Sequence, residues 1–468
     1  MKKHNLFKVV MITIAIAVVL SWLLPITYYS SSAGLVEESR DYIGIFDVMS
    51  YVGIAVQYFS HIGIYVLIIG GLYGVLHKIS GYRNLVDKIV KGFKSREWLF
   101  MTIVMVIFAV LSSMAGLSLP LLVMFPFVIA VVLAMGYDKI TAAMVTAGSV
   151  AIGLIGTVFN VNNTYGIDAV IGSTADGDIL VKILLLVISL ALLIFNVITY
   201  SNKHKDTKAI EKGSYIPEVS SSKKEKFWPI VVILDVVLLI LILAFISWDL
   251  FEVTWFSDAL NNIIDFKIGD FPIFDAVLGI SNSFGLWTLV EGSVVLLIAS
   301  WLISFIYRIK FSDYITYFMN GAKRALKAAV LVVLVYVVLV CTTYVPTLLT
   351  IFKPMLELTS GINVFIMSLV AFISSIFSVE LYYAATGVLP YVVGTLYTEL
   401  ATSDITLLSV IWQSFYGVAM LVAPTSVVLI ATLSYLHIPY GKWLKAIAKL
   451  LLELVVVLLI IFTIMTII

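Results

Sequence analysis

Long apolar runs constrain this chain more than any other feature of its sequence. Nine segments of roughly 18 residues or more carry few charges, which is about the length a helix needs to cross a bilayer. With 62% apolar and only 12% charged residues, the chain is a membrane protein rather than a soluble domain. We therefore expect spanning helices at 7–27, 54–76, 141–167, 180–200, 228–247, 285–307, 326–350, 406–435 and 443–467.

The first apolar run has two interpretations. It follows Met1-Lys2-Lys3-His4, which is how a secretory signal peptide begins. The run is longer than a typical signal core, and many spans follow it. We favour an uncleaved first helix.

Two further apolar regions, 98–135 and 362–397, do not fit a single spanning helix. The limbs Leu99–Leu111, Val364–Phe377 and Ala384–Tyr397 would each reach about 20 Å, whereas the hydrocarbon core is about 30 Å thick. We favour re-entrant hairpins whose tips are covered by protein, with two full crossings as the alternative for the first region. Small and polar residues divide these regions: Ser112, Ser113, Gly116, Ser118 and Pro120 in the first, and Ser374, Ser375, Ser378, Glu380, Thr386, Gly387 and Pro390 in the second.

Positive charges predict the orientation. Of the 29 Lys and Arg residues, 25 fall at the N-terminus or in loops that these spans place on one side, which the positive-inside rule assigns to the cytoplasm. The N-terminus is then inside and the C-terminus outside, and the two hairpins enter from opposite sides. Opposite entry indicates inverted-topology repeats: an N-terminal half at 1–200, a Lys-rich cytoplasmic linker at 201–227 and a C-terminal half at 228–468.

Two of the expected spans contain polar and helix-breaking residues. The first is interrupted at Gly156–Thr164, and the second at Gln413–Gly417 and Ala423–Ser426. Unwound backbone inside a bilayer is tolerated only where it lines a cavity, and paired breaks indicate a transport site.

Polar side chains near the breaks and hairpin tips are the candidate ligands for a substrate or a sodium ion, together with freed carbonyls and helix ends. The alternative is that Ser and Thr bond the preceding helical turn while small residues allow close packing. The candidates are Ser112, Ser113, Asn160, Asn162, Asn163, Thr164, Thr386, Gln413, Pro424, Thr425 and Ser426.

Four acids fall within expected membrane segments: Asp235, Glu291, Glu380 and Glu453. An unpaired carboxylate there costs at least a few kcal/mol, so each is a candidate for function. Glu380 is the strongest because it lies at the tip of the second hairpin, where its protonation could couple transport to a proton gradient or its charge could hold a cationic substrate. Asp235 and Glu453 either reach an interface or have a polar partner, and Glu291 is expected at the outer interface.

Other site types find no support in the sequence. The five histidines form no cluster, so we expect no metal site beyond sodium and no cofactor. The chain contains neither a P-loop nor a paired nucleophile and base, which argues against an ATP-driven pump or an enzyme. Its near-neutral net charge gives no reason to expect nucleic acid as a partner.

Short motifs in a consistent order give the chain a family resemblance. They are Trp22-Leu23-Leu24-Pro25, Gly136-Tyr137-Asp138, Pro424-Thr425-Ser426 and Pro439-Tyr440-Gly441-Lys442-Trp443. On these residues the chain resembles the YfcC-like family of bacterial membrane transporters, related to anaerobic four-carbon dicarboxylate carriers and p-aminobenzoyl-glutamate transporters. The resemblance implies an ion-transporter fold with two hairpins, a scaffold that contributes to a homodimer, and transport of amino acids or carboxylates.

The chain also departs from that family at several positions. An acidic segment usual in the first hairpin is replaced by Gly116–Leu122, and the usual Ser-Gly-rich tip of the second hairpin by Ser378–Ala384. The residues of both breaks differ as well. The family's substrate and coupling ion are therefore not carried over.

Together these observations predict an all-α polytopic protein of the bacterial cytoplasmic membrane, with about nine full spans and two re-entrant hairpins. We expect a secondary active transporter that moves a small amino acid or carboxylate by alternating access, coupled to sodium, protons or exchange. Its partners would be the substrate, the lipid bilayer and a second copy of the chain. The alternative is a nontransporting scaffold or receptor.

Overall fold

Eight of the described helices are long and apolar enough to cross a membrane, which confirms an all-helical polytopic membrane protein. Seven correspond to expected spans, and the eighth lies in the first hairpin region. They are α1 (Asn5–Leu23), α2 (Ile45–Leu76), α4 (Glu97–Ala115), α9 (Ile179–Lys203), α10 (Trp228–Phe245), α13 (Leu289–Ile306), α14 (Phe311–Tyr344) and α21 (Tyr440–Met465). The computed structural model describes residues 5–30, 32–38, 41–159, 167, 170–171, 179–205, 215–217, 225–269, 271–274, 282–359, 361–396 and 401–467.

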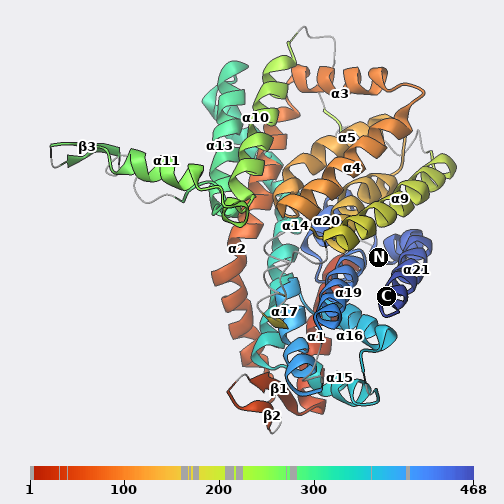
Figure 1. Cartoon of the computed structure of the whole chain (residues 1–468). Coiled ribbons are helices and arrows are strands. Elements are labelled where there is room, and N and C mark those ends of the chain that lie inside the picture. Colours follow the sequence, from red (N-terminus) through yellow and green to blue (C-terminus); the bar gives the residue numbers. More distant parts are fainter. Residues whose placement is uncertain are drawn as a thin grey trace.

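Helices α2, α10, α13 and α14 form one group, which we call the scaffold. Figure 1 shows them running side by side, and α2 and α14 are the longest helices described. The pair runs antiparallel, since the Tyr51 ring stacks on Tyr344 and the Phe59 ring on Tyr336. Farther along the pair, the backbones of Gly74 and Gly321 approach so closely that a Cβ on Gly74 would meet backbone atoms of α14. Small residues of this kind allow helices to pack tightly in membranes.

The second group contains the two hairpin regions and the two interrupted helices, and we call it the hairpin unit. Within it, α19 packs on both α16 and α7, and α4 packs on α7. Its first part comprises α4, η1 (Pro120–Met124), α5 (Phe125–Ala134), α6 (Lys139–Ala143), η2 (Met144–Gly148) and α7 (Ser149–Ile155). Its second part comprises α16 (Val364–Ile376), α17 (Leu381–Thr386), α18 (Leu389–Tyr391), η5 (Val392–Leu396), α19 (Thr402–Met420) and α20 (Val427–Leu436).

The first limb of the first hairpin is longer than expected. Helix α4 contains 19 residues and reaches about 28 Å, instead of ending at Leu111. It stays helical through Ser112 and Ser113 because both hydroxyls donate to backbone carbonyls of the neighbouring α7 segment. Gly116 then ends the helix with φ 65°, a left-handed conformation that favours glycine. The short-limb argument therefore does not hold for α4, and re-entry of both hairpins stays a prediction.

The second interruption is narrower than the sequence indicates. Helix α7 ends at Ile155, as expected for the first break, whereas Gln413–Gly417 is continuous α-helix within α19. The second interruption is confined to the six residues between Met420 and Val427. Two small residues of this stretch pack on the end of α7: the Ser414 hydroxyl donates to the Ile155 carbonyl at 3.0 Å, and Gly417 lies against the backbone of Leu154 and Ile155.

Shorter elements lie at the ends and side of the molecule. Strands β1 (Ile26–Ser30) and β2 (Gly34–Glu38) pair antiparallel beside α15 (Leu348–Leu356), where Lys353 forms an ion pair with Glu37. Figure 1 shows α3 (Ser80–Gly92) at the opposite end. It also shows α11 (Trp255–Ile264) reaching sideways from the molecule. In the chain, α11 lies between α10 and α13, and η4 (Trp248–Phe251), β3 (Lys267–Ile268) and β4 (Phe271–Pro272) flank it.

Candidate transport cavity

A cavity of about 490 Å³ lies where both hairpins and both interrupted helices meet. We call it the central cavity. The scaffold closes its other side through α2, α14 and the start of α13. The hairpin unit contributes Gly116, Ser118, Leu119, Pro120, Ala147, Val150, Ala151, Leu154, Val379, Glu380, Tyr416, Met420, Ser426, Val427 and Val428. The scaffold side contributes Phe59, His61, Ile62, Phe245, Trp287, Thr288, Leu289 and Tyr336.

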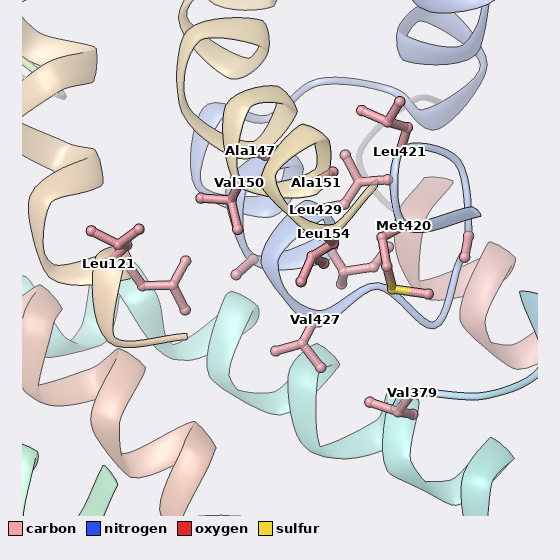
Figure 2. Packing of buried hydrophobic residues seen from close by; sticks show 14 of the residues in the cluster. Leu121, Ala147, Val150, Ala151, Leu154, Val379, Met420, Leu421, Val427 and Leu429 are labelled. Carbon is pink, nitrogen blue, oxygen red and sulfur yellow. The ribbon is translucent and has the colours of Figure 1, made fainter. Parts of the chain in front are cut away.

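Buried apolar side chains hold the interrupted segments together. Figure 2 shows Leu154 of α7 close to Leu429 of α20 and Met420, with Val427 below them. Leu121 after the first hairpin tip and Val379 at the second lie on either side of this cluster. Segments far apart in the sequence thus form one packed structure around the central cavity.

Serine hydroxyls attach the first hairpin to the first interrupted helix. Ser112 donates to the Val150 carbonyl at 2.9 Å and Ser113 to the Gly156 carbonyl at 2.5 Å. The backbone amides of Val158 and Phe159 in turn donate to the Ser113 carbonyl, at 3.1 and 3.3 Å. Gly156, Val158 and Phe159 lie past the end of α7, so the bonds with Ser113 satisfy backbone groups that have no helical partner. Ser112 and Ser113 lie behind the cavity wall and position it.

The second hairpin is attached to its interrupted helix in a comparable way. The Thr425 hydroxyl donates to the Ile376 carbonyl at 2.7 Å, and the Tyr416 hydroxyl donates to the Val379 carbonyl at 2.9 Å. Ser426 is the N-cap of α20, where its hydroxyl accepts from the Leu429 amide at 3.4 Å. The N-terminus of α20, a helix of 10 residues, therefore opens on the central cavity.

The candidate residues are distributed unevenly around this cavity. Glu380 and Ser426 line it. Thr425 lies behind its wall, as Ser112 and Ser113 do, while Thr386, Gln413 and Pro424 are absent from the lining. The Thr386 hydroxyl faces its own helix and donates to the Tyr383 carbonyl at 3.4 Å, and Gln413 is buried in α19. Asn160, Asn162, Asn163 and Thr164 lie outside the described residues, so their position stays a prediction.

The central cavity has an acidic side chain on one side and the positive end of a helix dipole on the other. Glu380 is the one acid among its described lining residues, and its side chain is exposed to the cavity. The α20 N-terminus, with Ser426, presents the positive end of a helix dipole and favours an anion. This arrangement can hold an anionic group near α20 and a cation near Glu380.

The other intramembrane acids have separate environments. Glu453 accepts a hydrogen bond from the side-chain amide of Asn196 at 2.5 Å, and its carboxylate lies 3.5 Å from the Lys449 ammonium group. It therefore has polar partners, which was one of the two alternatives for this residue. Glu291 accepts from the Thr288 amide at 2.8 Å and caps α13. Asp235 is exposed on α10.

Two residues of interest were missed at the sequence level. His61 of α2 lines the central cavity, but a single histidine in an apolar helix, with no second ligand nearby in the sequence, gives no sign of this position. Lys182 is buried in α9, and Gly156 at the first break packs against its backbone carbonyl. A single base in an otherwise apolar span was the available signal for Lys182. The described residues contain no group of three or more His, Cys, Asp or Glu that could hold a metal ion.

Comparison with known proteins finds one family model and a weakly similar solved structure. The family described as the C4-dicarboxylate anaerobic carrier, DcuC, matches residues 4–468. No curated protein matches the sequence. Among solved structures, the YdaH transporter of Alcanivorax borkumensis is similar at 14% identity and a TM-score of 0.42, over 98% of this chain and 97% of that chain.

Proposed function

The chain belongs to the C4-dicarboxylate anaerobic carrier family, and on that basis we propose that it is a secondary active transporter for a small carboxylate. The observation that carries the proposal is the central cavity, because both hairpin tips, both interrupted helices and the scaffold contribute to its walls. Interrupted helices around a shared cavity are the usual construction of a transporter site. The bacterial cytoplasmic membrane as location and a homodimer as assembly stay predictions.

Helix geometry suggests where the substrate carboxylate binds. We assign one carboxylate group to the N-terminus of α20, where Ser426 and the first backbone amides provide donors. The apolar surface formed by Val427, Val428 and Leu154 would contact the carbon chain. A pocket with few polar groups and mostly apolar walls is typical of small-molecule sites.

Glu380 gives a physical reason for cation coupling. Two like charges about 5 Å apart repel by about 3 kcal/mol at an effective dielectric constant of about 20. A dicarboxylate in the central cavity would meet this repulsion from an ionised Glu380. Binding a proton or a sodium ion together with the substrate removes it, so we propose that Glu380 couples transport to one of these cations.

Alternating access would involve motion between the hairpin unit and the scaffold. Hydrogen bonds from Ser112, Ser113, Tyr416 and Thr425 keep the hairpin unit together internally. Between the scaffold and the hairpin unit, the hydroxyls of Tyr65 and Tyr73 on α2 donate to backbone carbonyls of the first hairpin. We propose that the hairpin unit moves as one body, exposing the central cavity to one side of the membrane at a time.

Counterflow in proteoliposomes tests the proposed function. We expect the purified chain to exchange internal succinate, a four-carbon dicarboxylate, for labelled external succinate. Val428→Trp fills the cavity without removing a described hydrogen bond, and Ser426→Leu removes the proposed carboxylate contact. Both variants should lose at least tenfold in counterflow rate while inserting normally.

The control for this experiment is Thr463→Leu on α21. Thr463 is exposed and its hydroxyl bonds only within its own helix, so its counterflow rate should equal that of the wild type. Absence of counterflow with succinate and other small carboxylates in the folded wild type would reject the carrier proposal and favour a receptor. Unchanged rates in both cavity variants would move the site elsewhere.

A further inference from the structure

Three segments that lie far apart in the sequence meet at the end of the scaffold beside α3, and we call this meeting point the scaffold junction. They are α3 itself, residues 225–228 at the start of α10, and residues 307–308 at the end of α13. The Lys88 ammonium group of α3 lies over the rings of Phe227 and Trp228, at 4.5 and 5.6 Å from their centres. The Tyr307 hydroxyl donates to the Lys226 carbonyl at 2.5 Å. These contacts hold the three segments together.

Three cations of the scaffold junction have no carboxylate partner. They are Lys88, Lys226 and Arg308, and all three are exposed. Lys226 and Arg308 belong to the two segments that the Tyr307 hydrogen bond joins. Within the part of the chain that the structure describes, none of the three cations forms an ion pair. Exposed cations without a carboxylate partner attract an anion to this end of the scaffold.

The acids next to the two lysines in the chain already have partners. The Glu225 carboxylate accepts from the backbone amides of Ser80 and Gly81, at 2.8 and 3.4 Å, in the first turn of α3. The Asp87 carboxylate lies 3.0 Å from the Arg83 guanidinium on the same helix. These two carboxylates therefore bind other groups and do not neutralise the cations of the scaffold junction.

The end of α13 determines the position of Arg308. Its φ is 51°, a left-handed conformation in which glycine is usual after a helix. The Arg308 amide donates to the Phe305 carbonyl at 3.1 Å, and the Ile309 amide donates to the Ser304 carbonyl at 3.0 Å. These hydrogen bonds satisfy carbonyls of the last turn of α13. The backbone therefore fixes the point at which the arginine leaves the helix.

An exposed apolar stripe runs along α13 from the scaffold junction. Its members lie on successive turns and are each at least half exposed: Val294, Ile298, Trp301 and Phe305. The rings of Trp301 and Phe305 stack at 6.1 Å between centroids. From Val294 to Phe305 the helix rises about 17 Å, close to the roughly 15 Å of hydrocarbon in one leaflet. Asp235 interrupts the exposed side of α10, so the stripe of α13 is the better surface for an acyl chain.

We propose that the scaffold junction binds an anionic phospholipid such as phosphatidylglycerol. Lys88, Lys226 and Arg308 hold its phosphate group, and an acyl chain lies along the stripe of α13. Lysines and arginines at the membrane surface recognise anionic headgroups, and exposed rings such as Trp228 are typical of the interface. The apolar stripe beside the cations favours a lipid over free phosphate. This inference does not depend on the substrate that the chain carries.

Native mass spectrometry of the purified full chain, with dioleoylphosphatidylglycerol added to a nonionic detergent, tests this assignment. Each cation beside an anionic headgroup changes the affinity about fivefold. Lys226→Gln and Arg308→Gln should therefore each weaken phosphatidylglycerol binding about fivefold, and the double variant should weaken it about 25-fold. Dioleoylphosphatidylcholine, which has no net charge, should bind the wild type and the double variant equally. Unchanged phosphatidylglycerol binding in the folded single and double variants would overturn the site.

The matched control is the double variant Lys442→Gln with Lys445→Gln. Both lysines are exposed in the first turns of α21, so the variant removes the same total charge away from the scaffold junction. It should bind phosphatidylglycerol as the wild type does. Equal losses in the two double variants would overturn the site, because binding would then follow the net charge of the protein.

Two further observations separate a lipid from other occupants of the scaffold junction. Glycerol 3-phosphate carries the phosphate without acyl chains, and in large excess it should leave the bound phosphatidylglycerol in place. Displacement by glycerol 3-phosphate would overturn the lipid assignment in favour of a site for free phosphate. Lipid found on monomers but excluded from dimers in the same spectrum would also overturn it, because a second copy of the chain would then cover α13.

Discussion

Glu380 lies where the second hairpin turns, immediately before α17, and its carboxylate faces the central cavity. An ionised carboxylate at this position is costly within the membrane, and it also repels an anionic substrate. A cation that neutralises Glu380 lowers both of these free-energy costs. In our proposal, the coupling of transport therefore depends on a residue that need not contact the carboxylate substrate.

Replacing Glu380 with Gln removes the ionisable group and keeps the size of the side chain. We expect succinate uptake by Glu380→Gln to lose its response to the driving cation gradient, because no cation is then needed to offset a negative charge. Counterflow, which needs no gradient, should persist. The measurement is initial uptake into proteoliposomes with an imposed proton or sodium gradient.

Asp235→Asn provides the matched control for Glu380→Gln. Asp235 is another acid in an apolar helix, but it is exposed on α10 and lines no part of the central cavity. Its uptake should respond to the gradient as the wild type does. A normal gradient response in Glu380→Gln would show that another group binds the coupling ion.

Individual residues show how far sequence reasoning reaches. Glu380 and Ser426 are candidates because a carboxylate and a Pro-Thr-Ser sequence are unusual in apolar segments, and both line the central cavity, while their role in binding stays a prediction. The role of Ser113 was not predictable, since its acceptor is the Gly156 carbonyl 43 positions away. Polar residues that bind a ligand and those that join two helices look alike in one sequence.

Among the elements, the pair α2 and α14 determines the shape of the scaffold. Gly70 and Gly74 of α2 face Gly321 of α14, so the two backbones come into direct contact. Membrane helices gain stability from such packing, because lipid offers apolar side chains no less favourable surroundings than protein does. The glycines of this contact are therefore expected to be sensitive to any added atom.

Replacing Gly74 with Ala should destabilise the protein. The added Cβ would meet the Tyr317 carbonyl oxygen and backbone atoms of Gly321, so the helices must separate. Overpacking of this kind costs about 1–3 kcal/mol. Thermal unfolding of the purified protein, followed by circular dichroism, should show a clearly lower midpoint.

Gly53→Ala is the control, because it makes the same substitution on α2 at a position that does not contact α14. Nothing lies within 4 Å of a Cβ at Gly53. Alanine is the better helix former by about 1 kcal/mol, so the midpoint should stay the same or rise. Equal losses in the two variants would mean that the α2–α14 contact is not the cause.

For the helices, the sequence predicts their existence better than it predicts the residues at which they end. Seven of the spans were found from apolar length alone, because crossing a bilayer requires about 20 such residues. The second break was placed partly too early, at Gln413–Gly417. Those residues stay helical because Ser414 and Gly417 contact the end of α7, a partner that lies more than 250 positions away.

In the whole molecule, two tyrosines of α2 connect the scaffold to the first hairpin. Tyr65 donates to the Pro120 carbonyl at 2.9 Å, and Tyr73 donates to the Val123 carbonyl at 2.8 Å. Both hydrogen bonds cross the boundary along which we propose that the hairpin unit moves. These two hydrogen bonds stabilise the conformation described here relative to one in which the hairpin unit has moved along the scaffold.

Removing these hydroxyls should shift the balance between conformations. Each hydrogen bond contributes about 1 kcal/mol, so Tyr65→Phe and Tyr73→Phe should each change the ratio of conformations about fivefold. The readout is the rate at which an impermeant maleimide labels Leu119→Cys, a cavity position, from each side of the membrane. Cys341, the one natural cysteine, is buried and should not interfere.

Tyr416→Phe is the control for this shift. The Tyr416 hydroxyl bonds the Val379 carbonyl, so donor and acceptor both belong to the hairpin unit. The labelling ratio should then remain that of the parent Leu119→Cys protein. A ratio unaffected by Tyr65→Phe and Tyr73→Phe would indicate that the first hairpin does not move against α2.

The contact between α15 and the strand pair would limit how far the second hairpin could move in the proposed transport cycle. Lys353 of α15 pairs with Glu37, and Thr350 donates to the Pro25 carbonyl at 2.8 Å, so this helix is held against the strand pair and the end of α1. Only residues 357–363 connect it to α16. Seven residues extend to at most about 25 Å. The connector would therefore act as a tether, and its length sets an upper limit on the displacement in the motion that we propose.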